Sequence, residues 1–309
     1  MILITGGTGY LAGIIANFFA DKGYSVRLGT RRREVASKDL HYKVDVVDLN
    51  LLSNESLNNA IKGTSFVFHL ASMNYEDSKN DPDKAKIVNE DCTQKILKAS
   101  VAGNVKKIVY FSTMHIYGHN LKGNVTEQTI PAPLSVYGKT HLNAEKIVKD
   151  LSEKNNIEYL IFRLSNVSSP PIDADVNCWH LVIHDLCKQV IKKQEIELKS
   201  DGEQSRDFVH VNILNNNLEY FLKNTGLSGV YNFGSGKQTK IKDLAKVIQK
   251  EYKKIYSTNP EILLGENKMN EIEFSFNTNK LKNFFPYNES YSLEYIVSEL
   301  LSYCKINFS

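Results

Sequence analysis

The stretch Met1-Ile2-Leu3-Ile4-Thr5-Gly6-Gly7-Thr8-Gly9-Tyr10-Leu11-Ala12-Gly13 opens the chain and decides its fold. A short apolar run leads into closely spaced glycines and then into the apolar segment Ile14 to Phe19. Gly6 permits a tight turn, Gly9 lets the backbone approach a pyrophosphate at a helix N-terminus, and Ala12 packs against the strand. The alternative is a strained turn without a ligand, since glycine serves any such turn. The position between strand and helix favours dinucleotide binding.

The composition is that of a globular protein. The 309 residues are 42% hydrophobic, enough for two closely packed domains or one extended domain. Lys+Arg number 38 against 35 Asp+Glu, and the basic residues are scattered apart from Arg31-Arg32-Arg33, which argues against a nucleic-acid or membrane partner.

The cysteines and the apolar runs bear on the compartment. Cys92, Cys178, Cys187 and Cys304 are far apart, so the sequence suggests neither a disulfide framework nor a zinc site. The chain begins with a predicted strand and contains no apolar run near 18 residues. We expect a soluble cytoplasmic protein.

Short β-rich runs alternate with helical stretches through the first 165 residues. The predicted strands are Met1 to Thr5, Ser25 to Thr30, Tyr42 to Val46, Phe66 to Ala71, Lys107 to Ser112 and Glu158 to Arg163. The predicted helices are Gly13 to Lys22, Ser56 to Lys62, Lys84 to Ala102 and Tyr137 to Asn155. Because several strands are almost wholly apolar, the pattern predicts an α/β fold with a doubly wound parallel sheet.

The alternation loosens after residue 165. Ser168-Ser169-Pro170-Pro171 interrupts it, and a further strand is predicted from Val230 to Phe233. We expect a dinucleotide-binding domain over residues 1–165, with a returning segment at about 206–233. A smaller C-terminal α/β lobe, residues 166–205 and 234–309, is expected to hold the substrate across the carboxyl ends of the strands.

Eight motifs follow the glycine turn in order. They are Asp45-Val46-Val47-Asp48, His69-Leu70-Ala71-Ser72, Asn89, Ser112-Thr113-Met114-His115-Ile116-Tyr117-Gly118, Tyr137-Gly138-Lys139-Thr140-His141-Leu142-Asn143-Ala144-Glu145, Arg163-Leu164-Ser165-Asn166, Arg206-Asp207-Phe208-Val209-His210-Val211 and Asn232-Phe233-Gly234-Ser235-Gly236. The set resembles the extended short-chain dehydrogenases/reductases of the NAD-dependent epimerase/dehydratase family. This resemblance implies a Rossmann core, a substrate lobe and a sugar substrate carried by a nucleoside diphosphate.

The resemblance implies roles for two residues at the reacting centre. Thr113, four residues before the tyrosine of Tyr117-Gly118, matches the residue that orients the substrate hydroxyl. Tyr137 matches the tyrosine that opens a Tyr-x-x-x-Lys motif and donates or accepts a proton. The alternatives are a strand-end hydroxyl that caps the backbone for Thr113 and a half-buried helix-start tyrosine for Tyr137.

The resemblance also implies the ligand contacts. Asp45 and Val46 match an adenine contact, whereas Asn166 and Arg206 match the residues that hold the substrate diphosphate. The expected cofactor-binding residues are Gly6, Gly9, Tyr10, Leu11, Thr30, Arg31, Arg32, Asp45, Val46, Leu70, Ala71, Ser72, Asn89, Ser112, Tyr137 and His141. The alternatives are a helix cap for Asn89 and a surface ion pair with Asp207 for Arg206. His180 and His184 lack a third candidate ligand, so no metal is expected.

One departure from the family concerns the lysine. His141 stands four residues after Tyr137, and the neighbouring Lys139 and Lys146 point about 200° and about 180° away from Tyr137 on a helix. In the family the lysine holds the nicotinamide ribose and lowers the tyrosine pKa. With an ordinary pKa of about 6.5, a histidine can donate to the ribose but is mostly neutral at pH 7. This favours a reductase, in which the tyrosine acts as an acid.

A second departure lies at the end of the second strand. Thr30-Arg31-Arg32-Arg33 replaces the acid that would hold the ribose 2′-hydroxyl of NAD. Arginine binds phosphate bidentately, so NADP is the expected cofactor, with NAD as the alternative.

These observations predict an NADP(H)-preferring reductase of a keto group on a nucleotide-activated sugar, with Thr113, Tyr137 and His141 as catalytic residues. A nucleotide-sugar C4 epimerase or dehydrogenase with NAD is the alternative enzyme, and a catalytically silent dinucleotide-binding protein is an alternative of another class. Met114-His115 stands where the family's dehydratases carry an acid pair, so dehydration is disfavoured. We expect a homodimer.

Overall fold

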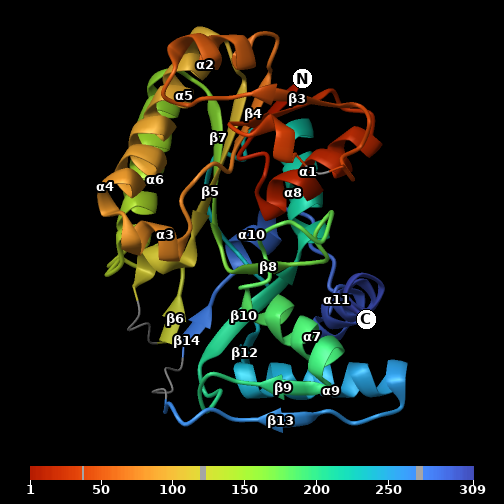
Figure 1. Cartoon of the computed structure of the whole chain (residues 1–309). Helices are drawn as coiled ribbons and strands as arrows, with labels where there is room; N and C mark the ends of the chain where they lie inside the picture. Colours follow the sequence, from red (N-terminus) through yellow and green to blue (C-terminus); the bar gives the residue numbers. More distant parts are fainter. Residues whose placement is uncertain (37, 119–122, 269–273) are drawn as a thin grey trace.

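A computed structural model describes residues 1–36, 38–118, 123–268 and 274–309. Within these ranges the centre is a seven-stranded sheet whose strands all run parallel, in the order β11-β7-β5-β4-β1-β2-β3 (Figure 1). This order reverses direction between β1 and β4, so a crevice is expected beside β1 at the carboxyl ends of the strands. The predicted doubly wound Rossmann fold is confirmed.

The strands of this sheet lie close to their predicted positions. They are β1 (Ile2–Thr5), β2 (Val26–Thr30), β3 (Val44–Asp48), β4 (Phe66–His69), β5 (Lys107–Thr113), β7 (Glu158–Leu164) and β11 (Gly229–Phe233). The strand predicted from Tyr42 to Val46 is shifted by two residues. It continues to Asp48 because Val46 and Val47 pair with Leu28 and Gly29 of β2.

Helices cover both faces of the sheet (Figure 1). Helices α1 (Tyr10–Asp21) and α8 (Val211–Lys223) pack on one face, where Phe19, Phe68 and Phe221 lie in one buried apolar cluster. Helices α2 (Asn54–Ile61), α5 (Cys92–Ala102) and α6 (Val136–Lys154) pack on the other. Both faces of the sheet are therefore covered by helices, as the continuous apolar strands predict.

The segment predicted as one helix from Lys84 to Ala102 is interrupted. Helix α3 (Tyr75–Asn80) is followed by α4 (Pro82–Lys86), then by a π-helical turn at Ile87–Asp91, and only then by α5. Such π turns occur often at functional sites. This one carries Asn89.

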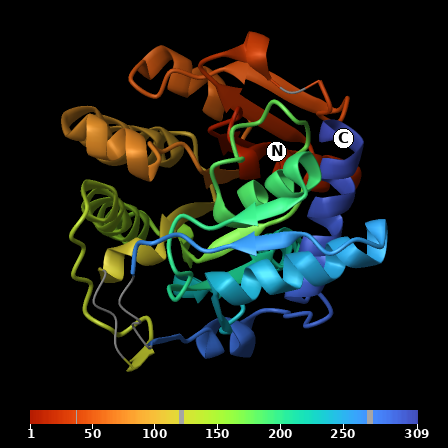
Figure 2. The same cartoon turned by 60° about the horizontal axis from the view of Figure 1, so that its bottom comes forward.

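The C-terminal lobe is continuous with the carboxyl end of β7. Strand β8 (Asn166–Ser168) joins β10 (Ser205–His210) and β12 (Gln238–Lys240) in a small sheet of order β12-β10-β8. The rest of the lobe consists of α7 (Val182–Lys193), α9 (Ile241–Tyr256), α11 (Leu293–Phe308) and the paired strands β9 (Glu195–Glu197) and β13 (Glu261–Leu263). Figure 2 brings this lobe to the front.

Five further short elements complete the described structure. They are the 3₁₀ turns at Arg33–Val35 and Met114–Tyr117, strands β6 (Gly123–Val125) and β14 (Phe274–Phe276), and helix α10 (Asn279–Phe284). The return to the central sheet was expected at about residue 206, but β10 belongs to the small sheet and the return begins with α8. No helix in the described ranges is both long and apolar enough to cross a membrane.

A buried carboxylate joins the central sheet to the lobe. Asp207 of β10 is fully buried and accepts hydrogen bonds from the Ser165 hydroxyl (2.7 Å), the Ser235 N–H (2.8 Å) and hydroxyl (3.1 Å), and the Gly236 N–H (2.6 Å). These partners follow β7 and β11. Asp207 therefore fixes the ends of both strands against β10.

Replacement of this carboxylate is expected to destabilise the chain. Asp207→Ala removes the acceptor of the partly buried N–H groups of Ser235 and Gly236 and of two hydroxyls, so the free energy of unfolding should fall by about 2–4 kcal/mol in urea titrations. The matched control is Asp243→Ala, which removes an exposed carboxylate paired with Lys246 and should cost less than about 0.5 kcal/mol. Equal costs would contradict this role of Asp207.

Candidate active site

The glycine turn fits an anion at the start of α1. Gly6 has a φ of +81°, and a Cβ there would lie 3.1 Å from the N atom of Ala71 at the end of β4. Gly9 is the N-cap of α1 and supplies no side-chain hydrogen bond, and the first turn has no acidic residue. The N–H groups at this helix start are thus left for a ligand of negative charge.

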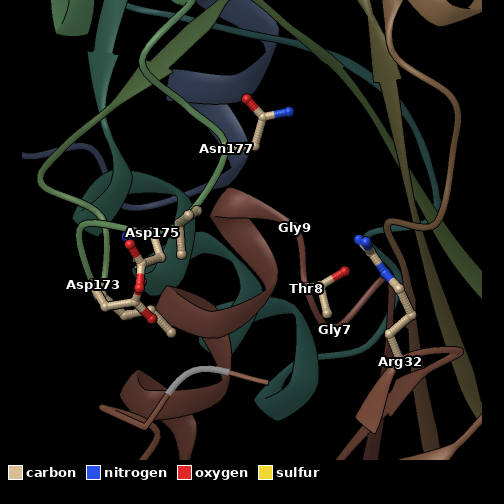
Figure 3. A pocket seen from close by; sticks show the side chains of 9 residues that line it. Gly7, Thr8, Gly9, Arg32, Asp173, Asp175 and Asn177 are labelled. Carbon is tan, nitrogen blue, oxygen red and sulfur yellow. Dashed lines mark hydrogen bonds between the residues drawn. The ribbon is translucent and has the colours of Figure 1, made fainter. Parts of the chain in front are cut away.

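A cavity of about 300 Å³ lies at this turn (Figure 3). It is lined by Gly7, Thr8, Gly9, Arg32, Ile172, Asp173, Asp175, Val176 and Asn177. Arg32 lies on the side of the glycine turn, while segment 172–177 between β8 and α7 supplies the opposite wall. Sequence reasoning missed this segment, whose nearest signal is the Pro170-Pro171 interruption.

Segment 172–177 rests on the first helix. A Cβ at Gly13 would overlap the Ile172 side chain, so a glycine allows the two elements to pack closely. The Tyr10 hydroxyl donates to the Ser169 carbonyl (2.7 Å) and accepts from the Ser169 N–H (2.7 Å). His184 Nε2 donates to the same carbonyl (2.9 Å). These contacts within the protein hold the lobe-side wall of the cavity against α1.

Tyr10 and Leu11 were expected to contact the cofactor through this helix start. Their side chains serve packing: the Tyr10 phenol holds Ser169, and Leu11 packs against the apolar cluster under the sheet. Only their backbone remains at the glycine turn. Leu70 and Ala71 lie against Gly6 as expected, with the Ala71 N–H donating to the Thr5 hydroxyl (3.1 Å), and Ser72 is exposed beside them.

A second cavity, of about 380 Å³, lies at the ends of β2 and β3. Arg31, Asp48, Leu49, Asn50, Leu52 and Ser56 line it. Thr30 is buried, and its hydroxyl accepts from the Arg32 N–H (3.1 Å). The structure therefore separates the two arginines, with Arg31 in this cavity and Arg32 in the first.

The structure does not bring Asp45 and Val46 to this second cavity. Asp45 lies within β3 and pairs with Arg27 of β2, with 3.1 Å between Oδ2 and Nε. The shifted end of β3 brings Asp48 and Leu49 to the carboxyl edge instead. Strand β3 ends two residues later than expected, at Asp48, which places Asp45 and Val46 inside the strand.

The structure brings the three expected catalytic residues, Thr113, Tyr137 and His141, close together. Thr113 ends β5, and Tyr137 and His141 lie one turn apart near the start of α6. The side chains of Thr113 and Tyr137 share a hydrogen bond. The Thr113 hydroxyl also accepts from the His115 N–H (3.2 Å), as the capping alternative predicts. The same hydroxyl therefore both caps the backbone and contacts Tyr137.

Aromatic rings surround the Tyr137 phenol. The ring centroids of His141, His115 and Tyr75 lie 4.5, 5.8 and 6.1 Å from that of Tyr137. Burial raises the pKa of Tyr137 and the bond to Thr113 lowers it, with a net increase. No lysine or arginine of the described residues is among these causes.

His141 is neutral and leaves one nitrogen unused. Its side chain is 1% exposed, and Nδ1 lies 2.8 Å from the Tyr110 hydroxyl. Nε2 has no hydrogen-bond partner among the described residues. Burial, with smaller effects of His69 and His115, lowers the pKa of His141 to about 3. The residue therefore supplies no positive charge at neutral pH.

Asn89 acts on α6 from the π turn. Its side chain is 1% exposed, its amide donates to the Thr140 hydroxyl (2.9 Å), and its carbonyl oxygen accepts from the Met73 N–H (2.8 Å). These bonds are not those of a helix cap. They use the amide on protein partners and hold the turn of α6 that lies between Tyr137 and His141.

Ser112 is likewise engaged within the protein. Its hydroxyl donates to Glu145 of α6 (2.5 Å), and Glu145 pairs with Arg163 of β7 at 2.8 Å between Oε2 and Nη2. Arg163 also donates to the Tyr117 hydroxyl (2.7 Å), which donates to Asn232 of β11 (2.6 Å). Glu145 and Arg163 belong to the motifs of the sequence, but the sequence alone assigned them no role.

The expected substrate residues lie at the lobe. The Asn166 amide donates to the Asp207 carbonyl (2.9 Å). Arg206 is half-buried and donates to the Ser205 carbonyl and to Gln204, both neutral. Asp207 points to the other face of β10 and bonds to Ser165, Ser235 and Gly236, so the ion-pair alternative for Arg206 is wrong. Arg206 thus keeps a charge suited to an anion.

Residues 2–234 match the model of the NAD dependent epimerase/dehydratase family. A putative UDP-glucose 4-epimerase of Methanocaldococcus jannaschii is 28% identical over 257 residues, which cover 81% of this chain and 82% of that protein.

Two solved structures illustrate the shared fold. The UDP-N-acetylglucosamine 4-epimerase of Methanobrevibacter ruminantium M1, in complex with UDP-N-acetylmuramic acid, superposes with a TM-score of 0.86 at 22% identity over 99% of this chain and 98% of that one. The UDP-glucuronic acid 4-epimerase of Bacillus cereus, in complex with UDP-glucuronic acid and NAD, superposes with a TM-score of 0.83 at 22% identity over 99% of each chain.

Three buried histidines make stability depend on pH. Burial lowers the pKa of His69 to about 4, of His184 to about 4 and of His141 to about 3, each from 6.5. Between about pH 4 and 6.5 the unfolded chain binds more protons, so their stabilisation is complete above pH 6.5 and falls as the pH decreases. We expect a loss of about 3 kcal/mol per histidine by pH 4.

The measurement is urea unfolding between pH 4 and 7.5. His184→Gln should flatten the slope by as much as about 1.4 kcal/mol per pH unit in this window, whereas His180→Gln, at an exposed position, should leave it unchanged. A slope unaffected by His184→Gln would contradict the assignment.

Proposed function

This chain belongs to the NAD dependent epimerase/dehydratase family, and we propose that it reduces a keto group on a nucleoside-diphosphate sugar with a nicotinamide dinucleotide. One observation carries the choice of reduction. The phenol of Tyr137 has a raised pKa and no cation beside it among the described residues, so it is protonated at neutral pH. A protonated phenol is the acid that a ketone reduction requires.

The residues present fit a dinucleotide. The uncapped start of α1 and the cavity at Gly7, Thr8 and Gly9 suit a pyrophosphate, and Asp48 and Leu49 at the second cavity suit the adenosine end. The unpartnered Nε2 of His141 suits a hydroxyl of the nicotinamide ribose. When bound, the reduced dinucleotide supplies the hydride.

The protein side of the reaction is a proton donation. Tyr137 donates its phenolic proton to the carbonyl oxygen of the sugar as that oxygen gains negative charge. Thr113, which bonds to Tyr137 at the end of β5, orients the same oxygen. Asn166 and Arg206 hold the diphosphate from the lobe, where Arg206 has only neutral partners in the described structure.

A C4 epimerase is the second candidate, and the named relatives favour it because they are 4-epimerases. An epimerase must use the same phenol as a base in its oxidative step. The neutral His141 gives little help to that step, since it does not stabilise tyrosinate. A silent dinucleotide-binding protein, the homodimer and the cytoplasmic location stay predictions of the sequence.

The proton donor is tested by turnover in both directions. With a panel of nucleotide 4-keto sugars and their alcohols, Tyr137→Phe should abolish turnover and Thr113→Val should reduce it by roughly 10²–10⁴. His141→Lys should leave reduction largely intact and speed oxidation near neutral pH, because a restored cation stabilises tyrosinate.

The outcomes separate the candidates. Undiminished turnover in Tyr137→Phe would remove the mechanism. Epimerisation by the wild type, without net reduction, would favour the second candidate, whereas binding without turnover across the panel would favour a silent protein.

Cofactor choice rests on the arginines after β2. NAD is named with the Bacillus cereus structure, but β2 is followed here by Arg31 and Arg32, which suit a 2′-phosphate. We expect Arg31→Asp to weaken NADPH binding at least tenfold, about 1.4 kcal/mol, and to spare NADH. The control with the same charge change is Arg33→Asp, an exposed residue outside both cavity linings. Equal losses for both cofactors, or unaltered NADPH affinity, would contradict a contact between Arg31 and the 2′-phosphate.

A further inference from the structure

Tyr110 is a buried residue of β5 to which the proposed reaction assigns no role. Its side chain is 1% exposed, and in the described part of the chain its hydroxyl has a single partner, His141 Nδ1 at 2.8 Å. The ring lies between two histidines, with centroids 5.9 Å from His69 and 5.8 Å from His141. This hydroxyl therefore meets the residue that replaces the family lysine.

The direction of this hydrogen bond follows from the available partners. If Nδ1–H donated to Tyr110, the phenolic proton would be buried without an acceptor, at a cost of about 1–3 kcal/mol. If the phenol donates to Nδ1, both groups are satisfied and the imidazole proton stays on Nε2. The second arrangement is favoured, since burial also raises the pKa of Tyr110 and keeps the phenol protonated.

His69 cannot offer Tyr110 another acceptor. Its Nδ1 lies 2.8 Å from the Thr5 hydroxyl and its Nε2 lies 3.0 Å from the Thr93 hydroxyl. Thr93 donates its own proton to the main-chain carbonyl of Asn89 (2.7 Å), so the Thr93 oxygen accepts from His69 Nε2–H. Nδ1 of His69 is then unprotonated and accepts from the Thr5 hydroxyl. Both nitrogens of His69 are thus used, and His141 remains the partner of Tyr110.

We propose that Tyr110 is a positioning residue that fixes His141 in the tautomer with its proton on Nε2. In this tautomer the Nε2–H group donates to a hydroxyl of the nicotinamide ribose. The ribose contact rests on the proposed function. A neutral donor fixed by a tyrosine takes over the binding role of a lysine without its charge. Because the donor and the acceptor of this bond both belong to the protein, the His141 tautomer is set before any ligand binds.

The tautomer is measured without any ligand. In protein labelled with ¹⁵N-histidine, with His141→Gln used to assign the resonances, Nδ1 of His141 should appear unprotonated and Nε2 protonated between pH 6 and 8. Tyr110→Phe should shift both resonances toward a mixture of tautomers. The matched control is Tyr159→Phe, which removes another hydroxyl of the same apolar cluster, one bonded to Glu153 (2.8 Å), and should shift neither. Protonated Nδ1 in the wild type would overturn the proposal.

The ribose contact is measured with two probes. Tyr110→Phe should weaken binding of NAD and NADPH by about threefold to tenfold and leave ADP, which lacks the nicotinamide ribose, unchanged. Unchanged dinucleotide affinity, or an equal loss for ADP, would overturn the positioning role. If the wild type bound neither ADP nor a dinucleotide, the proposed function itself would fail, and the resonances of His141 would still decide the tautomer.

Discussion

The buried ion pair between Glu145 and Arg163 holds the reacting centre together. It joins α6 to β7, and through the Ser112 hydroxyl it also joins α6 to the end of β5, one residue before Thr113. Loss of one partner of such a pair typically costs about 3–5 kcal/mol, because the other charge stays buried. The bond between Thr113 and Tyr137 exists only while these two elements keep this register. Asn89 and Thr140 add a neutral attachment one turn earlier on α6.

Charge in this structure is kept away from the phenol. The Arg163 guanidinium is neutralised by Glu145, and Lys139 and Lys146 are exposed on α6. The nearest ring to Tyr137 is the neutral His141, itself buried against Tyr110. A lysine at position 141 would bring a charged amine into this apolar surrounding, at a desolvation cost that a neutral imidazole avoids. The substitution thus changes the electrostatics of the site while conserving a hydrogen-bond donor.

The sequence predicted the sheet and the glycine turn from local patterns of a few residues, and the trio of Thr113, Tyr137 and His141 from the family resemblance. It ended β3 two residues early, at Val46, because the pairing of Val47 and Asp48 depends on the neighbouring residues Gly29 and Thr30 of β2. It could not assign the Asn89 and Ser112 side chains to Thr140 and Glu145, since these pairs are 51 and 33 residues apart. Tyr110 gave no signal, because a tyrosine in a buried strand has the pattern of a core residue.

The lobe and the central sheet each carry an arginine, Arg206 and Arg32, that forms no ion pair within the described residues. Arg206 bonds to neutral groups, and Arg32 lines the cavity opposite segment 172–177. The same cavity is also lined by Asp173 and Asp175, so Arg32 faces two carboxylates across it. A phosphate at the glycine turn would therefore meet both signs of charge, whereas only burial and Thr113 shift the pKa of Tyr137. No positive charge lowers the pKa of Tyr137 among the groups that shift it, and this is the condition under which a phenol remains protonated and can act as an acid.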